Sequence, residues 1–131
     1  MSNPATSAGN RSLLLVDADT VVGRLVLRTF EEAGWEVTTA GSRDAGLAAL
    51  KQRRFDRLLI NCYPPSIQGL LVLAGRAGTP NEATPSCVLG GPASAEIEEA
   101  HRLKAAWVRE FSDFKAREDL LQAVGGAGEA E

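Results

Sequence analysis

The chain has 131 residues, of which 44% are hydrophobic and 24% are charged, and its formal net charge at pH 7 is −3. This length suits a single globular domain, and the charges form no basic stripe, so direct nucleic-acid binding is not expected. No apolar run reaches the roughly 20 residues of a membrane-spanning helix, and the N-terminus lacks a signal-peptide pattern. We therefore expect a cytoplasmic protein with no membrane association.

The first half of the chain alternates short apolar runs with amphipathic stretches, as βαβ units do. Residues 13–16 form the apolar run of a buried strand, and residues 20–33 repeat apolar side chains at helical spacing. Gly34 follows this helix and suits a left-handed C-terminal cap. Ser42 is expected to cap a second helix. Further strands are predicted at residues 35–39 and 57–60.

The second half continues the same alternation. Pro64 and Pro65 prevent the third strand from continuing. A helix is predicted after these prolines, although Gly69 and Gly75 within it disfavour helix formation. Ser94 is expected to be the N-cap of the helix that follows the fourth strand. The predicted helices cover residues 67–77, 94–104 and 116–124, and the predicted strands cover residues 86–89 and 106–108.

Five strands alternating with five helices predict an α/β fold of the flavodoxin-like, doubly wound (βα)5 type, with a five-stranded parallel sheet in the order 2-1-3-4-5. The folded domain is predicted at residues 12–124, between a flexible N-terminal tail at 1–11 and a flexible C-terminal tail or linker at 125–131. Cys62 and Cys87 are expected to be reduced packing residues, and no metal site is expected.

The residues expected at the carboxyl ends of these strands resemble a known family. Residues 14–19 (Leu-Leu-Val-Asp-Ala-Asp), residues 55–61, and then Pro65 and Gly69 are similar in order and spacing to receiver domains of bacterial two-component response regulators. The resemblance covers about residues 13–124. It implies a domain in which an Asp ending the third strand is phosphorylated with the help of Mg²⁺, while a hydroxyl after the fourth strand and a Lys after the fifth contact the phosphate.

The chain departs from this family pattern at the phosphorylated residue and at the metal ligands. Asn61 stands in place of the phosphorylated Asp, and we interpret it as a structural filler rather than a phosphate mimic, since an amide carries no negative charge. Asp17 matches one of the acidic pair, but Ala18 stands where the direct metal ligand is expected. Asp19 matches a neighbour that is commonly acidic. Asp17 and Asp19 either cap the first helix or retain cation binding.

The residues that would contact the phosphate are also replaced. Gly90 falls where a Ser or Thr is expected after the fourth strand. Glu110 falls at the lysine position after the fifth strand, unless Lys115 is aligned there instead. Trp107 lies near the aromatic residue whose rotamer reports phosphorylation in receivers, and a Trp is less able to swing inward.

We therefore interpret the chain as a degenerate receiver, or pseudo-receiver. It is expected to be a non-enzymatic, phosphorylation-independent module of two-component signal transduction or a phosphorelay, without a cofactor or a metal ion. In receivers, the fourth helix, fifth strand and fifth helix form a face that contacts partners or an identical subunit. A protein partner or a second copy is accordingly expected there, at candidate residues Glu99, Arg102, Trp107, Arg109, Lys115 and Glu118.

Two alternatives stay open. A flavodoxin-like protein could bind a flavin, a nucleotide or another small molecule in the crevice, but it would need a phosphate-binding turn or convergent polar groups, and the sequence displays neither. A receiver could also retain phosphorylation on a different acceptor, such as Ser66 or Tyr63, although both lie past the strand end.

Overall fold

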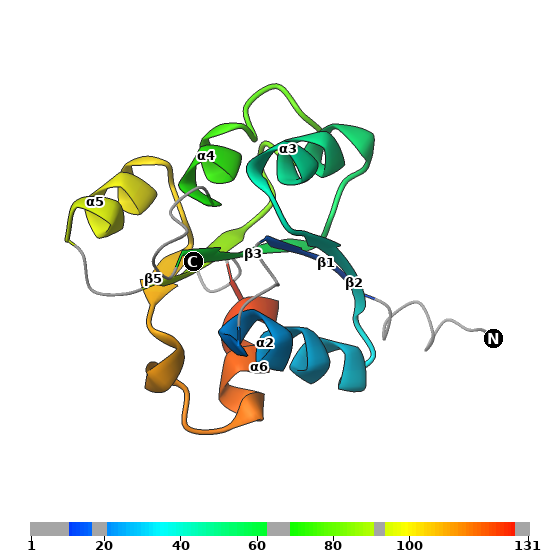
Figure 1. Ribbon diagram of the computed structural model, residues 1–131, viewed down its shortest axis with the longest axis vertical. Helices are drawn as coiled ribbons and strands as arrows, with labels where there is room; N and C mark the ends of the chain where they lie inside the picture. The colour runs from blue at the N-terminus through cyan, green and yellow to red at the C-terminus, as the bar shows by residue number, and fades with distance from the viewer. Residues whose placement is uncertain (1–10, 17–20, 63–68, 91–93, 128–131) are drawn as a thin grey trace.

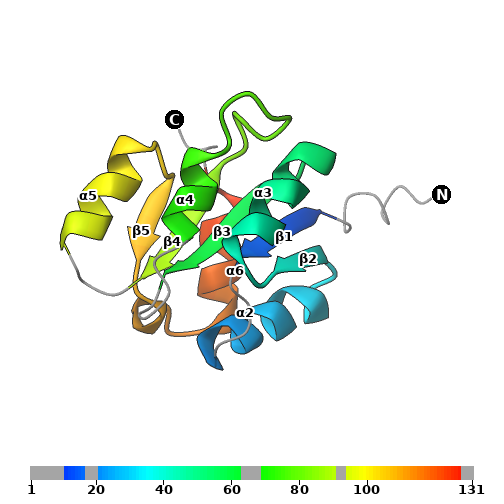
Figure 2. The same cartoon turned by 45° about the horizontal axis from the view of Figure 1, so that its top comes forward.

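The five predicted strands form one parallel sheet in the order β2-β1-β3-β4-β5 (Figures 1 and 2). The computed structural model describes residues 11–16, 21–62, 69–90 and 94–127. Each neighbouring pair of strands is parallel, which confirms the predicted flavodoxin-like sheet. The strands are β1 (Ser12–Val16), β2 (Glu36–Ala40), β3 (Arg57–Cys62), β4 (Ser86–Gly90) and β5 (Trp107–Arg109).

Helices cover both faces of the sheet (Figure 1). One face carries α3 (Arg43–Gln52), α4 (Gly69–Ala74) and α5 (Ser94–Arg102). The other face carries α2 (Val21–Glu32) and α6 (Arg117–Gly125), and a short 3-10 helix, η1 (Phe111–Asp113), connects β5 to α6. None of the helices in the described ranges is long and apolar enough to cross a membrane.

The core has two layers because successive side chains of a strand point to opposite faces. In β1, Leu14 and Val16 pack beneath α3, α4 and α5, whereas Leu13 and Leu15 pack beneath α2 and α6. The same alternation continues in β4, where Val88 belongs to the first layer and Cys87 to the second. Cys87 is a free, buried thiol, and this burial raises its pKa to about 12, in agreement with its predicted packing role.

Two of the predicted helix caps, at Ser42 and Gly34, are present. The Ser42 side chain accepts a hydrogen bond from the Ala45 N–H at 3.1 Å, which satisfies one of the free donors at the start of α3. After α2, Gly34 has a φ of 92°, and the Trp35 N–H donates to the Phe30 carbonyl at 3.0 Å. This left-handed turn ends the helix in the way the glycine predicts.

A buried asparagine, Asn81, connects the amino edge of the sheet to the end of α3. Its side chain is fully buried, and its Oδ1 accepts a hydrogen bond from the Phe55 N–H at 2.8 Å. Its Nδ2 donates to the carbonyls of Leu50 at 2.9 Å and Arg53 at 2.7 Å. Leu50 lies in the last turn of α3 and Arg53 is its C-cap residue, where no intrahelical donor is available for these carbonyls.

Two buried arginines donate hydrogen bonds to carbonyls at the C-terminal ends of the last two helices. Arg57 donates to the carbonyls of Val124 at 2.9 Å and Gly125 at 2.7 Å, at the end of α6. Arg76 donates to the Leu103 carbonyl at 2.8 Å, just after α5. A cation at a helix C-terminus is also favoured by the helix dipole. Three helices are therefore anchored at the amino edge of the sheet through their C-terminal ends.

Two sequence expectations need correction. The helix predicted at 67–77 is shorter, since α4 ends at Ala74. A Cβ at Gly75 would collide with the Leu47 side chain, so this glycine allows α3 and α4 to approach closely. Residues 125–127 were expected in a flexible tail, but Gly125 ends α6 and Ala127 is 5% exposed within the second core layer. The folded domain therefore extends beyond residue 124.

We predict that Asn81→Ala lowers the free energy of unfolding by about 3 kcal/mol, because it leaves three backbone groups without their partner at about 1–3 kcal/mol each. Urea unfolding followed by circular dichroism measures this loss. Gln52→Ala, which removes an exposed amide at the end of α3, is the matched control and should stay within about 0.5 kcal/mol of wild type. A loss for Asn81→Ala no larger than that of the control would contradict the anchoring role.

Candidate functional site

The carboxyl edge of the sheet brings Asn61 and Gly90 onto neighbouring strands. In the register of β3 with β4, Asn61 lies opposite Leu89, and Cys62 lies opposite Gly90. Strand β1 ends at Val16, which lies opposite Ile60, the residue before Asn61. The ends of three strands therefore meet where doubly wound folds place their ligands. Asp17, Ala18 and Asp19 lie outside the described residues, as do the alternative acceptors Tyr63 and Ser66.

Asn61 is a buried amide, with 1% of its side chain exposed. A carboxylate at the same place would lose most of its hydration, at a cost that only a nearby cation or several donors could offset. An amide avoids that cost but has no anionic oxygen with which to attack phosphorus. Gly90, which is also buried, contributes only backbone atoms. Neither residue can therefore perform the step that a phosphorylated Asp and its neighbouring hydroxyl perform.

Glu110 directly follows β5, and its backbone N–H donates to the Asp113 carboxylate at 3.0 Å. Lys115 is exposed and lies beyond η1, next to the start of α6. The residue at the strand end is thus an acid, and the lysine is separated from the strand by the 3-10 helix. Among the described residues, no group of three or more His, Cys, Asp and Glu side chains could hold a metal ion.

The six residues predicted on the partner surface lie on both sides of the sheet at its β5 edge. On α5, Arg102 forms a two-point ion pair with Glu99, with hydrogen bonds of 3.1 and 2.5 Å. Hydrogen bonding to Glu99 raises the pKa of Arg102, so the guanidinium stays charged at every physiological pH. On the opposite side, Trp107 packs in the layer beneath α6. The β5 edge lies between these two groups (Figure 1).

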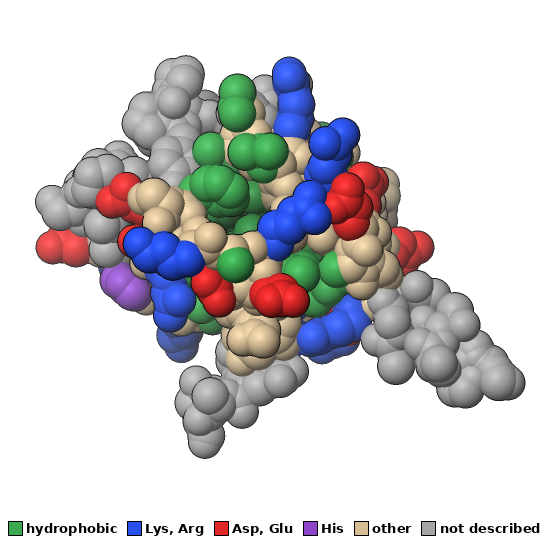
Figure 3. Space-filling view, turned by 90° about the horizontal axis from the view of Figure 1, so that it is seen from below, with side chains coloured by type: hydrophobic (Ala, Val, Ile, Leu, Met, Phe, Trp, Pro, Cys, Tyr) green, Lys and Arg blue, Asp and Glu red, His purple; other side chains and the backbone are tan. Residues whose placement is uncertain are grey.

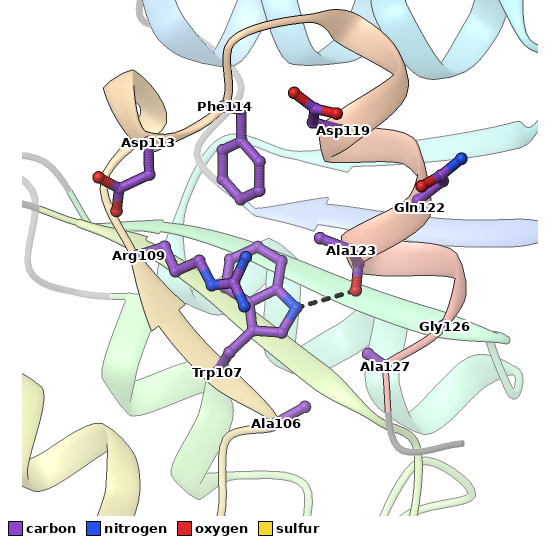
Figure 4. Close-up of a pocket in the computed structure, with 10 residues that line it drawn as sticks. All are labelled: Ala106, Trp107, Arg109, Asp113, Phe114, Asp119, Gln122, Ala123, Gly126 and Ala127. Carbon is purple, nitrogen blue, oxygen red and sulfur yellow. Dashed lines mark hydrogen bonds between the residues drawn. The ribbon is translucent and has the colours of Figure 1, made fainter. Parts of the chain in front are cut away.

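Trp107 forms the floor of a cavity of about 580 Å³ between β5 and α6 (Figure 4). Its indole Nε1–H donates to the Ala123 carbonyl at 2.9 Å, which fixes the ring against the helix. The Phe114 ring lies beside it, with 5.6 Å between the ring centroids. These two contacts fix the orientation of the Trp107 ring in the cavity.

Arg109 covers both aromatic rings of this cavity. Its guanidinium carbon lies 5.4 Å from the Trp107 ring centroid and 5.8 Å from that of Phe114, within cation–π range. Asp113 and Asp119 also line the cavity (Figure 4), and each accepts a backbone hydrogen bond. The cavity therefore combines an exposed guanidinium stacked on two aromatic rings with two carboxylates in its lining.

The remaining predicted residues lie at the start of α6. Glu118 is exposed in its first turn, where an acidic side chain is favoured by the helix dipole. Arg117 pairs with Glu32 at 2.7 Å and so connects α6 to α2. Seen from the side of these helices, apolar side chains gather near the middle of the face between charged ones (Figure 3). Two exposed apolar residues on α2 are Val21 and Leu25.

Sequence reasoning selected Trp107 and Arg109 but missed Phe114 and the two aspartates that line the same cavity. Phe114 lies outside every predicted element, so periodicity gave no reason to choose it. The available signal was local, since an aromatic residue just before an amphipathic helix needs apolar surface to cover it.

No protein-family model matches the sequence. A curated protein, the probable transcriptional regulatory protein TcrX of Mycobacterium tuberculosis, is 32% identical over 62 residues, which are 47% of this chain. The match covers 26% of that protein, so the similar region is about a quarter of the relative's length.

Solved structures match over most of the chain. A response regulator protein from Burkholderia pseudomallei with a phosphorylated aspartic acid has a TM-score of 0.73 and 21% identity, covering 92% of this chain and 70% of that one. The chemotaxis protein CheY4 of Vibrio cholerae has a TM-score of 0.72 and 24% identity, covering 87% of this chain and 95% of that one. The receiver domain of the Pseudomonas aeruginosa sensor histidine kinase PA1611, with a magnesium ion in its cleft, has a TM-score of 0.72 and 21% identity, with coverages of 89% and 98%.

These similarities, together with the strand order, define the class of fold. The chain has the fold of response regulator receiver domains, as the sequence resemblance implied. At these identities the likeness establishes the architecture, and the chemistry of the site must be argued from the residues present.

We predict that Trp107→Phe lowers the free energy of unfolding by about 1 kcal/mol, because it removes the hydrogen bond to Ala123 while keeping an aromatic ring. Urea unfolding monitored by circular dichroism tests this without depending on tryptophan fluorescence. Arg109→Gln is the control on the same cavity, and it should cost no more than about 1 kcal/mol, since the guanidinium is exposed. Equal stability of Trp107→Phe and wild type would contradict the fixed orientation of the indole.

Proposed function

We propose that the protein is a receiver-type signalling module that transmits information by protein–protein contact and does not transfer a phosphoryl group. It acts without catalysis, in the manner of a pseudo-receiver within a two-component or phosphorelay pathway. The observation that carries the proposal is the buried amide of Asn61 at the carboxyl end of β3 in a receiver fold. An amide nitrogen and carbonyl cannot form the acyl phosphate that a carboxylate forms.

The residues around Asn61 support the same proposal. Gly90 supplies no hydroxyl, and Glu110 places an acid directly after β5. Transfer of a phosphoryl group needs positive charge at the reacting centre, from a cation or a lysine. Glu110, at the lysine position directly after β5, cannot supply that positive charge.

The similar proteins support a role for this chain in signalling. The Burkholderia pseudomallei neighbour carries a phosphorylated aspartic acid, and the similar Mycobacterium tuberculosis protein is a probable transcriptional regulatory protein. We infer that this chain serves in signalling of that kind, with output through binding. The likeness to these proteins supports the scaffold, while Asn61 supports the loss of phosphorylation.

We assign the binding surface to α5, β5 and α6. Trp107 and Arg109 form an aromatic and cationic pair at the sheet edge, and both residue types are enriched among the side chains that dominate binding energy at interfaces. Arg102 and Lys115 supply exposed charge on the two sides of this pair. The partner is a protein, either a second copy of the chain or another component of the pathway.

Restoring carboxylates tests the chemical part of the proposal. Asn61→Asp alone supplies a nucleophile without a ligand at Ala18, so acetyl phosphate and Mg²⁺ should label it slowly or not at all. The double change Ala18→Asp with Asn61→Asp should be labelled faster. Intact-mass spectrometry measures the added phosphoryl group. Labelling of Asn61→Asp at the rate of the double variant would show that Ala18 is not a missing ligand.

Charge reversal tests the surface part. Arg102→Glu and Lys115→Glu should weaken self-association or partner capture, measured by light scattering and by pull-down from source-cell extract. Each should change the free energy of unfolding by no more than about 1 kcal/mol, because exposed ion pairs contribute little. Lys51→Glu on α3 is the matched control and should leave association unchanged. The surface assignment is wrong if Asn61→Ala abolishes binding in a folded protein while the two reversals have no effect.

A further inference from the structure

Arg76 is a buried cation whose hydrogen-bond partners within the described part of the chain are all neutral. Its side chain is 9% exposed, and its guanidinium donates to the carbonyls of Thr84 at 2.7 Å and Leu103 at 2.8 Å and to the Ser86 hydroxyl at 3.0 Å. No carboxylate among the described residues pairs with it, and burial lowers its pKa. A buried charge of this kind is costly unless an opposite charge compensates it.

The guanidinium also has donors to spare. Arginine carries five N–H groups, and the three hydrogen bonds to Thr84, Ser86 and Leu103 use three of them within the described part of the chain. The other two remain for a ligand, and a guanidinium binds the oxygens of a carboxylate or a phosphate through such N–H groups.

A cavity of about 330 Å³ adjoins Arg76 at the amino edge of the sheet. Thr84 and Pro85, just before β4, and Ala106, just before β5, form its walls. This volume is at the lower end of the range for small-molecule sites. The cavity lies at the opposite edge of the sheet from Asn61, so it is separate from the degenerate phosphorylation site.

Lys104 adds a second cation to the same cavity. Its φ of 67° is in the left-handed region, which disfavours a lysine and suits glycine. The backbone needs this turn, because the Lys104 N–H donates to the His101 carbonyl and the Ala105 N–H donates to the Ala100 carbonyl at the end of α5. A lysine here therefore costs stability in the free protein while it supplies an exposed ammonium beside Arg76.

One acidic side chain opposes these two cations. Glu82 also lines the cavity, and its Oε1 accepts a weak hydrogen bond from the Gly78 N–H at 3.4 Å. Glu82 is exposed and forms no ion pair with Arg76 or Lys104. Its carboxylate would repel an anion, so removing this charge by Glu82→Gln should strengthen anion binding.

We propose that this cavity binds a phosphate group, free or carried as a monoester on a small molecule. Arg76 would hold two oxygens with its free N–H groups, and Lys104 would supply a point charge on the open side. The inference is independent of the proposed function, because its two cations, Arg76 and Lys104, belong neither to the carboxyl edge nor to the Trp107 cavity.

The test is a titration of the ¹⁵N-labelled full chain with inorganic phosphate at constant ionic strength, followed by amide chemical shifts. We expect saturable shifts at Thr84, Lys104 and Ala106. Lys104→Gln should weaken binding about tenfold, the size of a lost charge-assisted hydrogen bond. Lys104→Gly should weaken it equally while raising the melting temperature, and Glu82→Gln should tighten it. Lys51→Gln on α3 is the matched control and should bind as wild type does.

Two further ligands distinguish the sources of the anion. Glycerol 3-phosphate binding more tightly than inorganic phosphate would identify a monoester, and the reverse would identify free phosphate. Acetate binding as tightly as phosphate would overturn the assignment. Three other results would also overturn it: shifts confined to Asn61 and Gly90, a titration that does not saturate, or unchanged phosphate binding by Lys104→Gln. None of these results depends on how the protein signals.

Discussion

Hydrogen bonds from buried polar side chains to helix carbonyls hold the amino edge of this sheet together. Asn81, Arg57 and Arg76 each contact carbonyls at or just after the C-terminal end of a different helix, α3, α6 and α5. Each contact satisfies groups that the helix cannot satisfy itself, and each places a polar side chain where its removal would leave unpaired atoms. The two apolar core layers then pack between the sheet and the helices, while these hydrogen bonds position the C-terminal ends of α3, α5 and α6.

Such an arrangement lets the opposite edge change its chemistry without loss of the fold. The carboxyl edge carries Asn61 and Gly90, neither of which contributes to the anchoring at the amino edge. Exchange of a carboxylate for an amide at a buried position also removes a desolvation cost, so the scaffold gains stability where the catalytic charge is lost. The receiver fold would therefore persist without phosphoryl transfer, as we propose for this chain.

The strand order and the two-layer core were predictable from the sequence, because apolar runs, helical periodicity and caps such as Ser42 and Gly34 are local signals. The roles of Asn81, Arg57 and Arg76 were not, since their partners are 31, 67 and 27 residues away in the chain. The exchange at Asn61 could be read from the sequence, but only beside the family pattern. The Trp107 cavity depends on Phe114, which no periodic pattern marks.

The most direct test of the central claim is phosphorylation of the unaltered protein. Wild-type chain is incubated with acetyl phosphate and Mg²⁺, beside a receiver domain that is known to be labelled, and both are examined by intact-mass spectrometry. We expect the mass of this chain to stay unchanged while the reference domain gains a phosphoryl group. A stoichiometric phosphoryl adduct on the wild-type chain would contradict it.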